Sequence, residues 1–119
     1  MTDTKLIHIT HAMPVEILND LALTATGGVG YWARPLNDPS HPHRPVSELW
    51  TEYDESDGSP FGEKFVLNAD LIVKGIEACS KVRPDIWHRF ATDVIDGSAD
   101  IDACDTIVQF GVFGELVYG

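Results

Sequence analysis

Residues 46–67, VSELWTEYDESDGSPFGEKFVL, contain two strand-like runs on either side of a polar turn. Branched and aromatic residues alternate with polar ones from Val46 to Tyr53, as they do in a half-buried strand. The polar segment that follows is rich in turn-forming residues, and a second run, KFVL, begins at Lys64. Because strands that follow each other in sequence usually pair, these residues predict an antiparallel hairpin.

A third strand is predicted before the hairpin. The segment from Val29 to Arg34 is rich in aromatic and branched residues, which favour an extended chain. Several prolines follow within a short polar stretch, and this stretch is expected to be a loop because proline interrupts both ladders and helices. Together with the hairpin, this strand gives a three-stranded antiparallel meander.

One helix is predicted before the sheet. It begins near Pro14, whose missing N–H costs nothing in the first turn of a helix. Gly27 and Gly28 are expected to end it through a left-handed cap. Apolar residues recur at three- and four-residue spacing along this segment, which indicates one buried face. They are Ile17, Leu18, Leu21, Ala22 and Ala25.

Three more helices are predicted after the sheet. A typical helix-starting residue precedes each apolar stripe, and Gly97 separates the second helix from the third. The starting residues are Asn68, Pro84 and either Ser98 or Asp100. The sequence therefore predicts a single α+β domain over residues 1–119, made of one helix, a three-stranded antiparallel meander and then three helices packed on it.

The C-terminal segment, residues 107–119, is apolar on nearly every side. As one helix it would lie either at the centre of the core or in a subunit interface. Because exposed apolar side chains are costly, we expect a second copy to cover the surplus face in a two-fold homodimer. In the alternative arrangement, residues beyond Gly114 leave the helix and add an edge strand, which buries Leu116 and Tyr118.

Charge limits the possible partners. Nineteen Asp and Glu residues face eight Lys and Arg residues, so the net charge is −11. Nucleic acids are bound through clustered Lys and Arg, so direct nucleic-acid binding is not expected. An acidic surface instead attracts a basic partner and speeds its association.

Two zones concentrate this negative charge, one between Glu48 and Glu63 and one between Asp93 and Asp105. If they adjoined in space, they would mimic the spaced phosphates of a duplex and could occupy the basic groove of a DNA-binding protein. The alternative is two separate solvated surfaces. The candidate partner-binding residues are Glu48, Glu52, Asp54, Glu55, Asp57, Asp96, Asp100 and Asp102.

A second candidate site lies beside the glycines at 27–30. Tyr31, Trp32 and Arg34 could together stack on and charge-pair with a small planar or phosphorylated ligand. This makes a small-ligand-binding or nucleotide-sequestering protein the alternative function. Tryptophan is more often a core residue, however, and we expect Trp32 to be buried.

A third alternative is a metal-dependent enzyme. His41 and His43 stand two residues apart in the proline-rich loop, and Asp38 could supply another ligand. The loop specifies no further ligand, and the chain contains no recognisable nucleophile or paired catalytic carboxylates. We therefore predict no catalytic residues, no bound metal and no other cofactor.

The first residues, the apolar runs and the cysteines indicate where in the cell the protein resides. The first residues lack the basic and apolar regions of a secretory signal, and no apolar run is long enough to cross a membrane. Cys79 and Cys104 occupy apolar positions of helical patterns, so we expect buried free thiols in a reducing compartment. These observations predict a cytoplasmic protein.

Three segments resemble small proteins of actinobacterial phages. They are GVGYWA at 28–33, FVLNAD at 65–70 and the ending from Ile107 to Gly119, which has an FGExVYG-like form. The resemblance implies a viral accessory protein acting in a bacterial cytoplasm, and it carries no catalytic residues over to this chain. Such proteins bind and block host or defence proteins, or capture nucleotides, so it favours an inhibitor of a host macromolecule.

Overall fold

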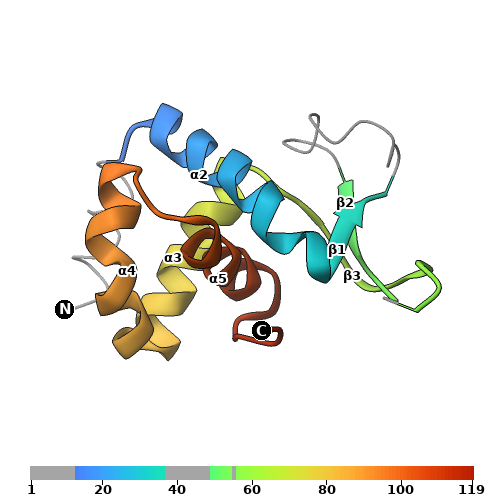
Figure 1. Cartoon of the computed structure of the whole chain (residues 1–119). Helices are drawn as coiled ribbons and strands as arrows, with labels where there is room; N and C mark the ends of the chain where they lie inside the picture. Colours follow the sequence, from blue (N-terminus) through green and yellow to red (C-terminus); the bar gives the residue numbers. More distant parts are fainter. Residues whose placement is uncertain (1–12, 37–48, 55) are drawn as a thin grey trace.

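The computed structural model describes residues 13–36, 49–54 and 56–119, and its elements follow the predicted order (Figure 1). An α+β fold is confirmed. The elements are helix α2 (Val15–Gly28), the 3₁₀ turn η1 (Val29–Tyr31), strands β1 (Ala33–Pro35), β2 (Leu49–Tyr53) and β3 (Pro60–Val66), and helices α3 (Ala69–Val82), α4 (Pro84–Asp96) and α5 (Ile101–Phe113). The helices form one end of the molecule and the sheet forms the other.

The sheet is the predicted antiparallel meander, in the order β1-β2-β3. Ala33 pairs with Glu52, and Trp50 pairs with Phe65 on the other side of β2. The prediction of a strand from Val29 was wrong, because residues 29–31 form a 3₁₀ turn and extended pairing begins only at Ala33. The pairing of β2 with β3 shifts between Thr51 and Glu52, whose partners are Lys64 and Phe61, so the two extra residues of this bulge lie on β3.

Most helix ends lie where the sequence places them. The Asn68 side chain accepts a hydrogen bond from the Leu71 N–H at 3.0 Å, and the Asp100 side chain accepts one from the Ala103 N–H at 2.9 Å. These bonds satisfy N–H groups that have no partner inside the helix. Pro84 is the first residue of α4, and Gly97 ends it at a φ of 82°.

Gly27 and Gly28 do not form the predicted left-handed cap. Helix α2 runs through both residues into η1, and Gly28 has a φ of −94°. The reason for glycine at 28 is close packing, since a Cβ there would lie 2.5 Å from the Ile101 carbonyl oxygen. Gly28 therefore allows α2 to approach the first turn of α5.

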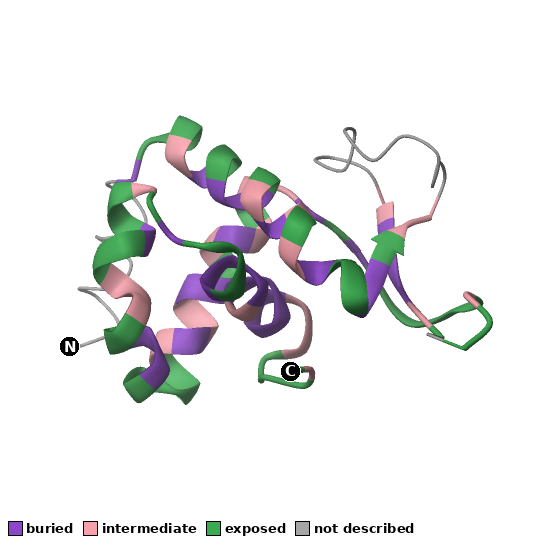
Figure 2. Cartoon of the chain, in the orientation of Figure 1, coloured by how far each residue is buried: buried purple, intermediate pink, exposed green. Residues whose placement is uncertain are grey.

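Helix α5 is the central helix, with α2 and α3 packed against it. Ile107 and Phe110 are both buried within the chain (Figure 2). Gly114 ends the helix at a φ of 75°, so the prediction of one helix over residues 107–119 was wrong. The residues after Gly114 leave the helix, as the alternative predicted, but they turn back without forming the edge strand. The homodimer stays a prediction, with Ile107 and Phe110 covered by the chain itself and Leu116 and Val117 exposed.

The two cysteines are buried and unpaired, as predicted. Burial raises the pKa of Cys79 to about 11 and that of Cys104 to about 12. Both thiols therefore stay protonated at neutral pH, and they pack as small apolar side chains. Among the described residues, no helix is both long and apolar enough to cross a membrane.

Candidate protein-binding surface and the polar cluster beside it

Six exposed acidic side chains gather on the helical end of the molecule. Helix α2 supplies two of them, the end of α4 two, and the start of α5 two. We call them the acidic face: Glu16, Asp20, Asp93, Asp96, Asp100 and Asp102. Gly97 lies against Ile17, with its Cβ position 3.4 Å from the Ile17 methyl carbon, so the first turns of α2 adjoin the α4–α5 junction.

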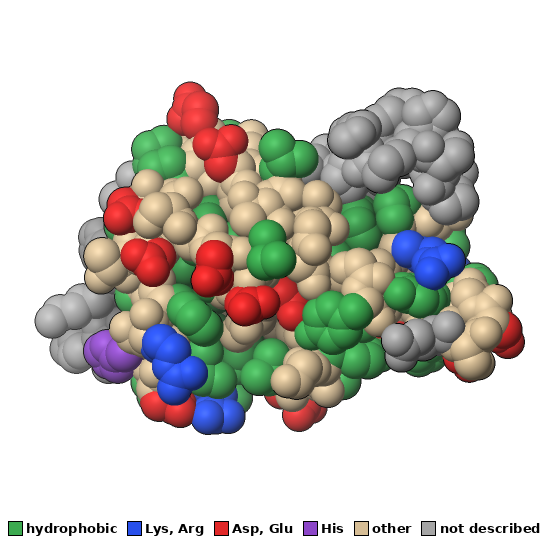
Figure 3. Space-filling model, viewed as in Figure 1, with side chains coloured by type: hydrophobic (Ala, Val, Ile, Leu, Met, Phe, Trp, Pro, Cys, Tyr) green, Lys and Arg blue, Asp and Glu red, His purple; other side chains and the backbone are tan. Residues whose placement is uncertain are grey.

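The acidic face is visible as a group of carboxylates over these three elements (Figure 3). The Lys and Arg side chains in this view lie below that group and on the sheet, away from its centre. The side chains of Asp20, Asp93 and Asp102 form no hydrogen bond or ion pair within the described part of the chain. Their charges are therefore available to another molecule.

Two acidic-face residues also shape the backbone. The Asp96 carboxylate accepts hydrogen bonds from the Ser98 N–H at 2.9 Å and from the Ser98 hydroxyl, and these bonds lower the pKa of Asp96. Asp100 caps α5, as described above. Hydrogen bonds thus hold both side chains in place, which gives this part of the acidic face a fixed geometry.

The other predicted acidic zone lies at the opposite end of the molecule. Asp54 and Asp57 belong to the β2–β3 turn, where their carboxylates accept hydrogen bonds from Ser56 and Ser59. These bonds to Ser59 lower the pKa of Asp57. The turn projects from the sheet, far from α4 along the longest dimension of 45 Å (Figure 1). The described acids of the two zones therefore form two surfaces, and the duplex-like single patch is not formed by them.

One predicted partner-binding acid is buried, and two lie outside the described residues. Glu52 is only 7% exposed, and its carboxylate is used inside the chain, so its assignment to a partner surface is corrected. Glu52 lies two residues after Trp50 on β2, so its side chain is on the same face of the sheet as that buried tryptophan. Glu48 and Glu55 lie outside the described residues.

Asp105 is the centre of a buried polar cluster that the sequence did not reveal. Its carboxylate accepts hydrogen bonds from the Tyr31 hydroxyl at 2.7 Å, from the Trp32 indole N–H at 2.8 Å and from the Gln109 amide at 3.1 Å. The sequence counted Asp105 among the exposed acids. One available signal was its spacing of four residues from Gln109 on an otherwise apolar helix, because buried polar groups on one helix face need partners.

Gln109 joins this cluster to the C-terminal tail, residues 114–119. The carboxamide oxygen of Gln109 accepts the N–H groups of Val117 at 2.9 Å and Tyr118 at 2.7 Å. Its amide also donates to the Tyr118 carbonyl at 3.3 Å. The fully buried Gln109 side chain thus takes the place of the hydrogen-bond partners that the backbone of a neighbouring strand would supply. It holds the tail against α5.

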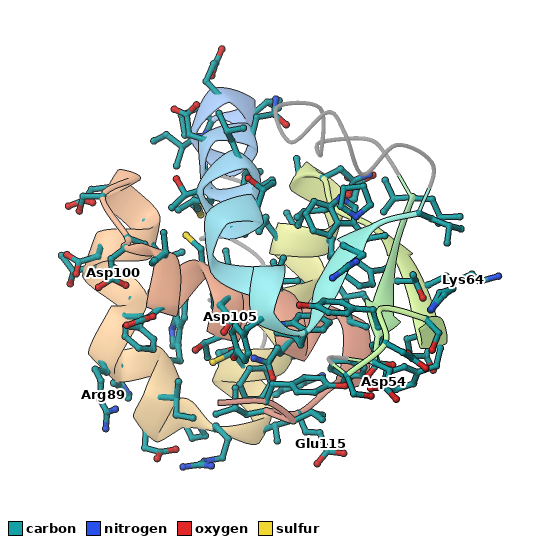
Figure 4. The ribbon with its side chains drawn as sticks, turned by 45° about the vertical axis from the view of Figure 1, so that its right-hand side comes forward. Asp54, Lys64, Arg89, Asp100, Asp105 and Glu115 are labelled. Carbon is teal, nitrogen blue, oxygen red and sulfur yellow. The ribbon has the colours of Figure 1, made fainter. Side chains whose placement is uncertain are left out.

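Tyr118 completes the cluster at the sheet. Its ring stacks on Trp32 with centroids 5.1 Å apart and an interplanar angle of 9°, and its hydroxyl donates to Glu52. The second Glu52 oxygen accepts the Glu63 N–H at 2.8 Å. Figure 4 shows this crowded region around Asp105, between the sheet and the returning tail near Glu115.

Two of the three tyrosines are expected to ionise only in strong alkali. Burial, followed by the hydrogen bond and charge of Asp105, raises the pKa of Tyr31 to about 12. Burial and Glu52 do the same for Tyr118, whose pKa is also about 12. Both values exceed the ordinary value of 10.0, so the stability linked to them is complete below pH 10 and is lost as the pH rises towards 12.

An alkaline absorbance titration measures this directly. We expect two late-ionising tyrosines in the native protein and one in a Tyr118→Phe variant, which keeps the ring but removes the hydroxyl. In urea unfolding, the native protein should lose more stability across this pH window than the variant. Ionisation of Tyr31 and Tyr118 near the ordinary pKa of 10.0 would contradict the hydrogen-bonded arrangement.

The predicted aromatic ligand site does not form as one open surface. Trp32 is 1% exposed, as expected for a core residue, and Tyr118 and Phe65 stack against its ring. The Arg34 guanidinium instead lies 3.7 Å from the centre of the Tyr53 ring. Tyr31 and Arg34 are both exposed, but the Tyr31 hydroxyl is bound to Asp105, so neither lies beside an open Trp32 ring.

The predicted metal alternative concerns residues that the structure does not describe. Asp38, His41 and His43 all lie outside the described residues. Within residues 13–36, 49–54 and 56–119, no three His, Cys, Asp or Glu side chains are grouped so that they could hold a metal ion.

Comparison with protein-family models, with curated proteins and with solved structures finds no match to this chain. Two features of the structure bear on its function, the polar cluster and the acidic face. The polar cluster has its hydrogen-bonding groups occupied, and no buried side-chain nitrogen or oxygen in the described residues lacks a partner. The acidic face, in contrast, presents carboxylates that have no hydrogen-bond or ion-pair partner within the described residues.

Proposed function

We propose that this protein is a non-enzymatic binding protein whose acidic face binds a basic surface of another protein. The observation that carries the proposal is the exposure of six carboxylates on adjoining parts of α2, α4 and α5. The resemblance of three segments to phage proteins makes a bacterial host protein the partner class that we propose, with inhibition as the outcome of binding.

Electrostatics favours this class of partner over others. Like charges held close together repel one another, and a basic partner relieves that repulsion as it approaches. Phosphate backbones and anionic membranes would increase it, so neither is the proposed partner. A groove that normally binds nucleic acid is one basic surface of the required kind.

Two variants that each remove three negative charges distinguish an effect of the acidic face from an effect of net charge. In the face variant, Asp20, Asp93 and Asp102 are replaced by asparagine. In the control variant, Asp54→Asn, Asp57→Asn and Glu63→Gln remove three exposed charges from the β2–β3 hairpin. Each substitution is nearly isosteric, and none removes the caps at Asn68 or Asp100.

Capture from a bacterial lysate, with quantitative mass spectrometry, tests the proposal. We expect the native protein and the control variant to capture the same basic protein, and the face variant to capture much less of it. Raising the salt concentration should also reduce capture, because exposed charges are screened over about 8–10 Å near physiological ionic strength. Equal loss in both variants would show that only net charge matters, and undiminished capture by the face variant would contradict the proposal.

A further inference from the structure

An exposed apolar strip borders the acidic face. The negative charge of the acidic face does not account for these exposed apolar side chains. Leu23 is 53% exposed, Ile101 is 50% exposed and Tyr31 is 45% exposed. We call these three residues the apolar strip. They lie on α2, at the start of α5 and in η1, respectively, so the strip follows the line along which α2 meets α5.

Contacts near Gly27 and Asp105 connect the three residues of the apolar strip. The Cβ position of Gly27, one turn after Leu23, lies 3.9 Å from the Ile101 methyl carbon. Asp105 follows Ile101 by one turn of α5, and it binds the Tyr31 hydroxyl. Because Gly27 has no side chain, it leaves the neighbouring Ile101 side chain uncovered, and that side chain is 50% exposed.

The acids flank the strip along both helices. On α2, Glu16, Asp20, Leu23 and Gly27 are all exposed and follow the four-three-four spacing of one helix face. On α5, Asp100 and Asp102 stand on either side of Ile101. Hydrophobic side chains accordingly lie among the red carboxylates in the space-filling view (Figure 3).

We infer that the apolar strip seats a basic amphipathic helix of the partner protein. The inference rests on the proposed function and specifies the contact that the acidic face makes. Apolar side chains of the helix would cover Leu23, Ile101 and Tyr31, and its Lys or Arg side chains would reach Asp20, Asp100 and Asp102. Charge complementarity selects this occupant, since a second copy of this chain would bring the same acids against themselves at a net charge of −11 per chain.

Two synthetic peptides of equal charge provide the test. One is a helical peptide of lysine and leucine with the leucines on one face, and the other has serine in place of each leucine. Titration calorimetry measures their affinity for the full chain. We expect the lysine–leucine peptide to bind at least about tenfold more tightly, which corresponds to about 1.4 kcal/mol.

Two double variants locate the apolar contact. Leu23→Ser with Ile101→Ser removes two members of the strip, and Val82→Ser with Val117→Ser removes two equally exposed apolar residues elsewhere. We expect the first pair to abolish the preference for the lysine–leucine peptide and the second pair to leave it intact. All four side chains are at least half exposed, and thermal unfolding of each variant checks that its fold is kept.

The outcomes separate the inference from the proposed function. Equal binding of both peptides, with weaker binding to the face variant, would overturn the inference and leave the proposed function standing. A preference for leucine that survives loss of Leu23 and Ile101 would also overturn it. If neither peptide binds the native chain, the inference fails, and the capture experiment with the face and control variants then decides the proposed function separately.

Discussion

Replacement of Trp32 by alanine is expected to lower the free energy of unfolding by ~3–5 kcal/mol, the usual cost of truncating a buried tryptophan. The ring is 1% exposed and packs against Phe65, Phe113 and Tyr118. Its loss would also leave part of the Asp105 carboxylate without a hydrogen-bond donor. Since a domain of this size is stable by only about 5–15 kcal/mol, urea unfolding should show a large shift.

A Trp32→Phe variant separates the two contributions. Phenylalanine keeps much of the packed ring area but cannot donate to Asp105, so we expect a cost smaller than that of alanine. A cost of less than ~1 kcal/mol for alanine, the size of an ordinary surface substitution, would mean that Trp32 does not hold the sheet, the tail and α5 together.

Replacement of Gly75 by alanine is expected to destabilise the protein although alanine is the better helix former. Helix propensity alone favours alanine over glycine by roughly 0.5–1 kcal/mol. A Cβ at Gly75, however, would overlap the Ile107 carbonyl oxygen on α5. Overpacking of this kind typically costs ~1–3 kcal/mol or more, and the clash is with backbone, which cannot rotate away.

Gly30→Ala is the matched control for this variant, because nothing lies within 4 Å of its Cβ position. We expect Gly30→Ala to leave stability nearly unchanged while Gly75→Ala lowers the midpoint of thermal unfolding. A stabilised Gly75→Ala protein would mean that α3 and α5 are farther apart than described here.

Local sequence signals predicted the elements of this fold well. Side-chain caps at Asn68 and Asp100, a proline at 84 and a glycine at 97 act within one helical turn, so their effect can be recognised from neighbouring residues alone. The antiparallel meander followed from the order of its strands. These features need no knowledge of distant contacts.

Features that depend on distant contacts could not be predicted. The role of Gly28 is set by the Ile101 carbonyl far along the chain, and local rules suggested a cap instead. Asp105 resembled an exposed acid until Tyr31 and Trp32 were placed beside it. The tail turns back because Gln109 supplies its hydrogen bonds, and nothing in the sequence of α5 indicates that the partner of Gln109 is the tail.

The sequence predicted part of the acidic face and missed the rest of it. Charge counting correctly placed exposed acids at Asp96, Asp100 and Asp102. It missed Glu16 and Asp20, because α2 is distant in sequence and reaches the α4–α5 junction only through packing of Ile17 on Gly97. The surface on which the proposed function depends is therefore a product of the tertiary fold.

The association rate constant of the captured basic partner tests the central claim most directly. Stopped-flow measurements with the native protein, the face variant and the hairpin control variant, at low and at high salt, compare equal charge changes at two places. We predict a slower association for the face variant alone, and a difference that shrinks as salt screens the charges. Association rates that are the same for the face and hairpin variants at low salt would contradict the claim that this protein binds through its acidic face.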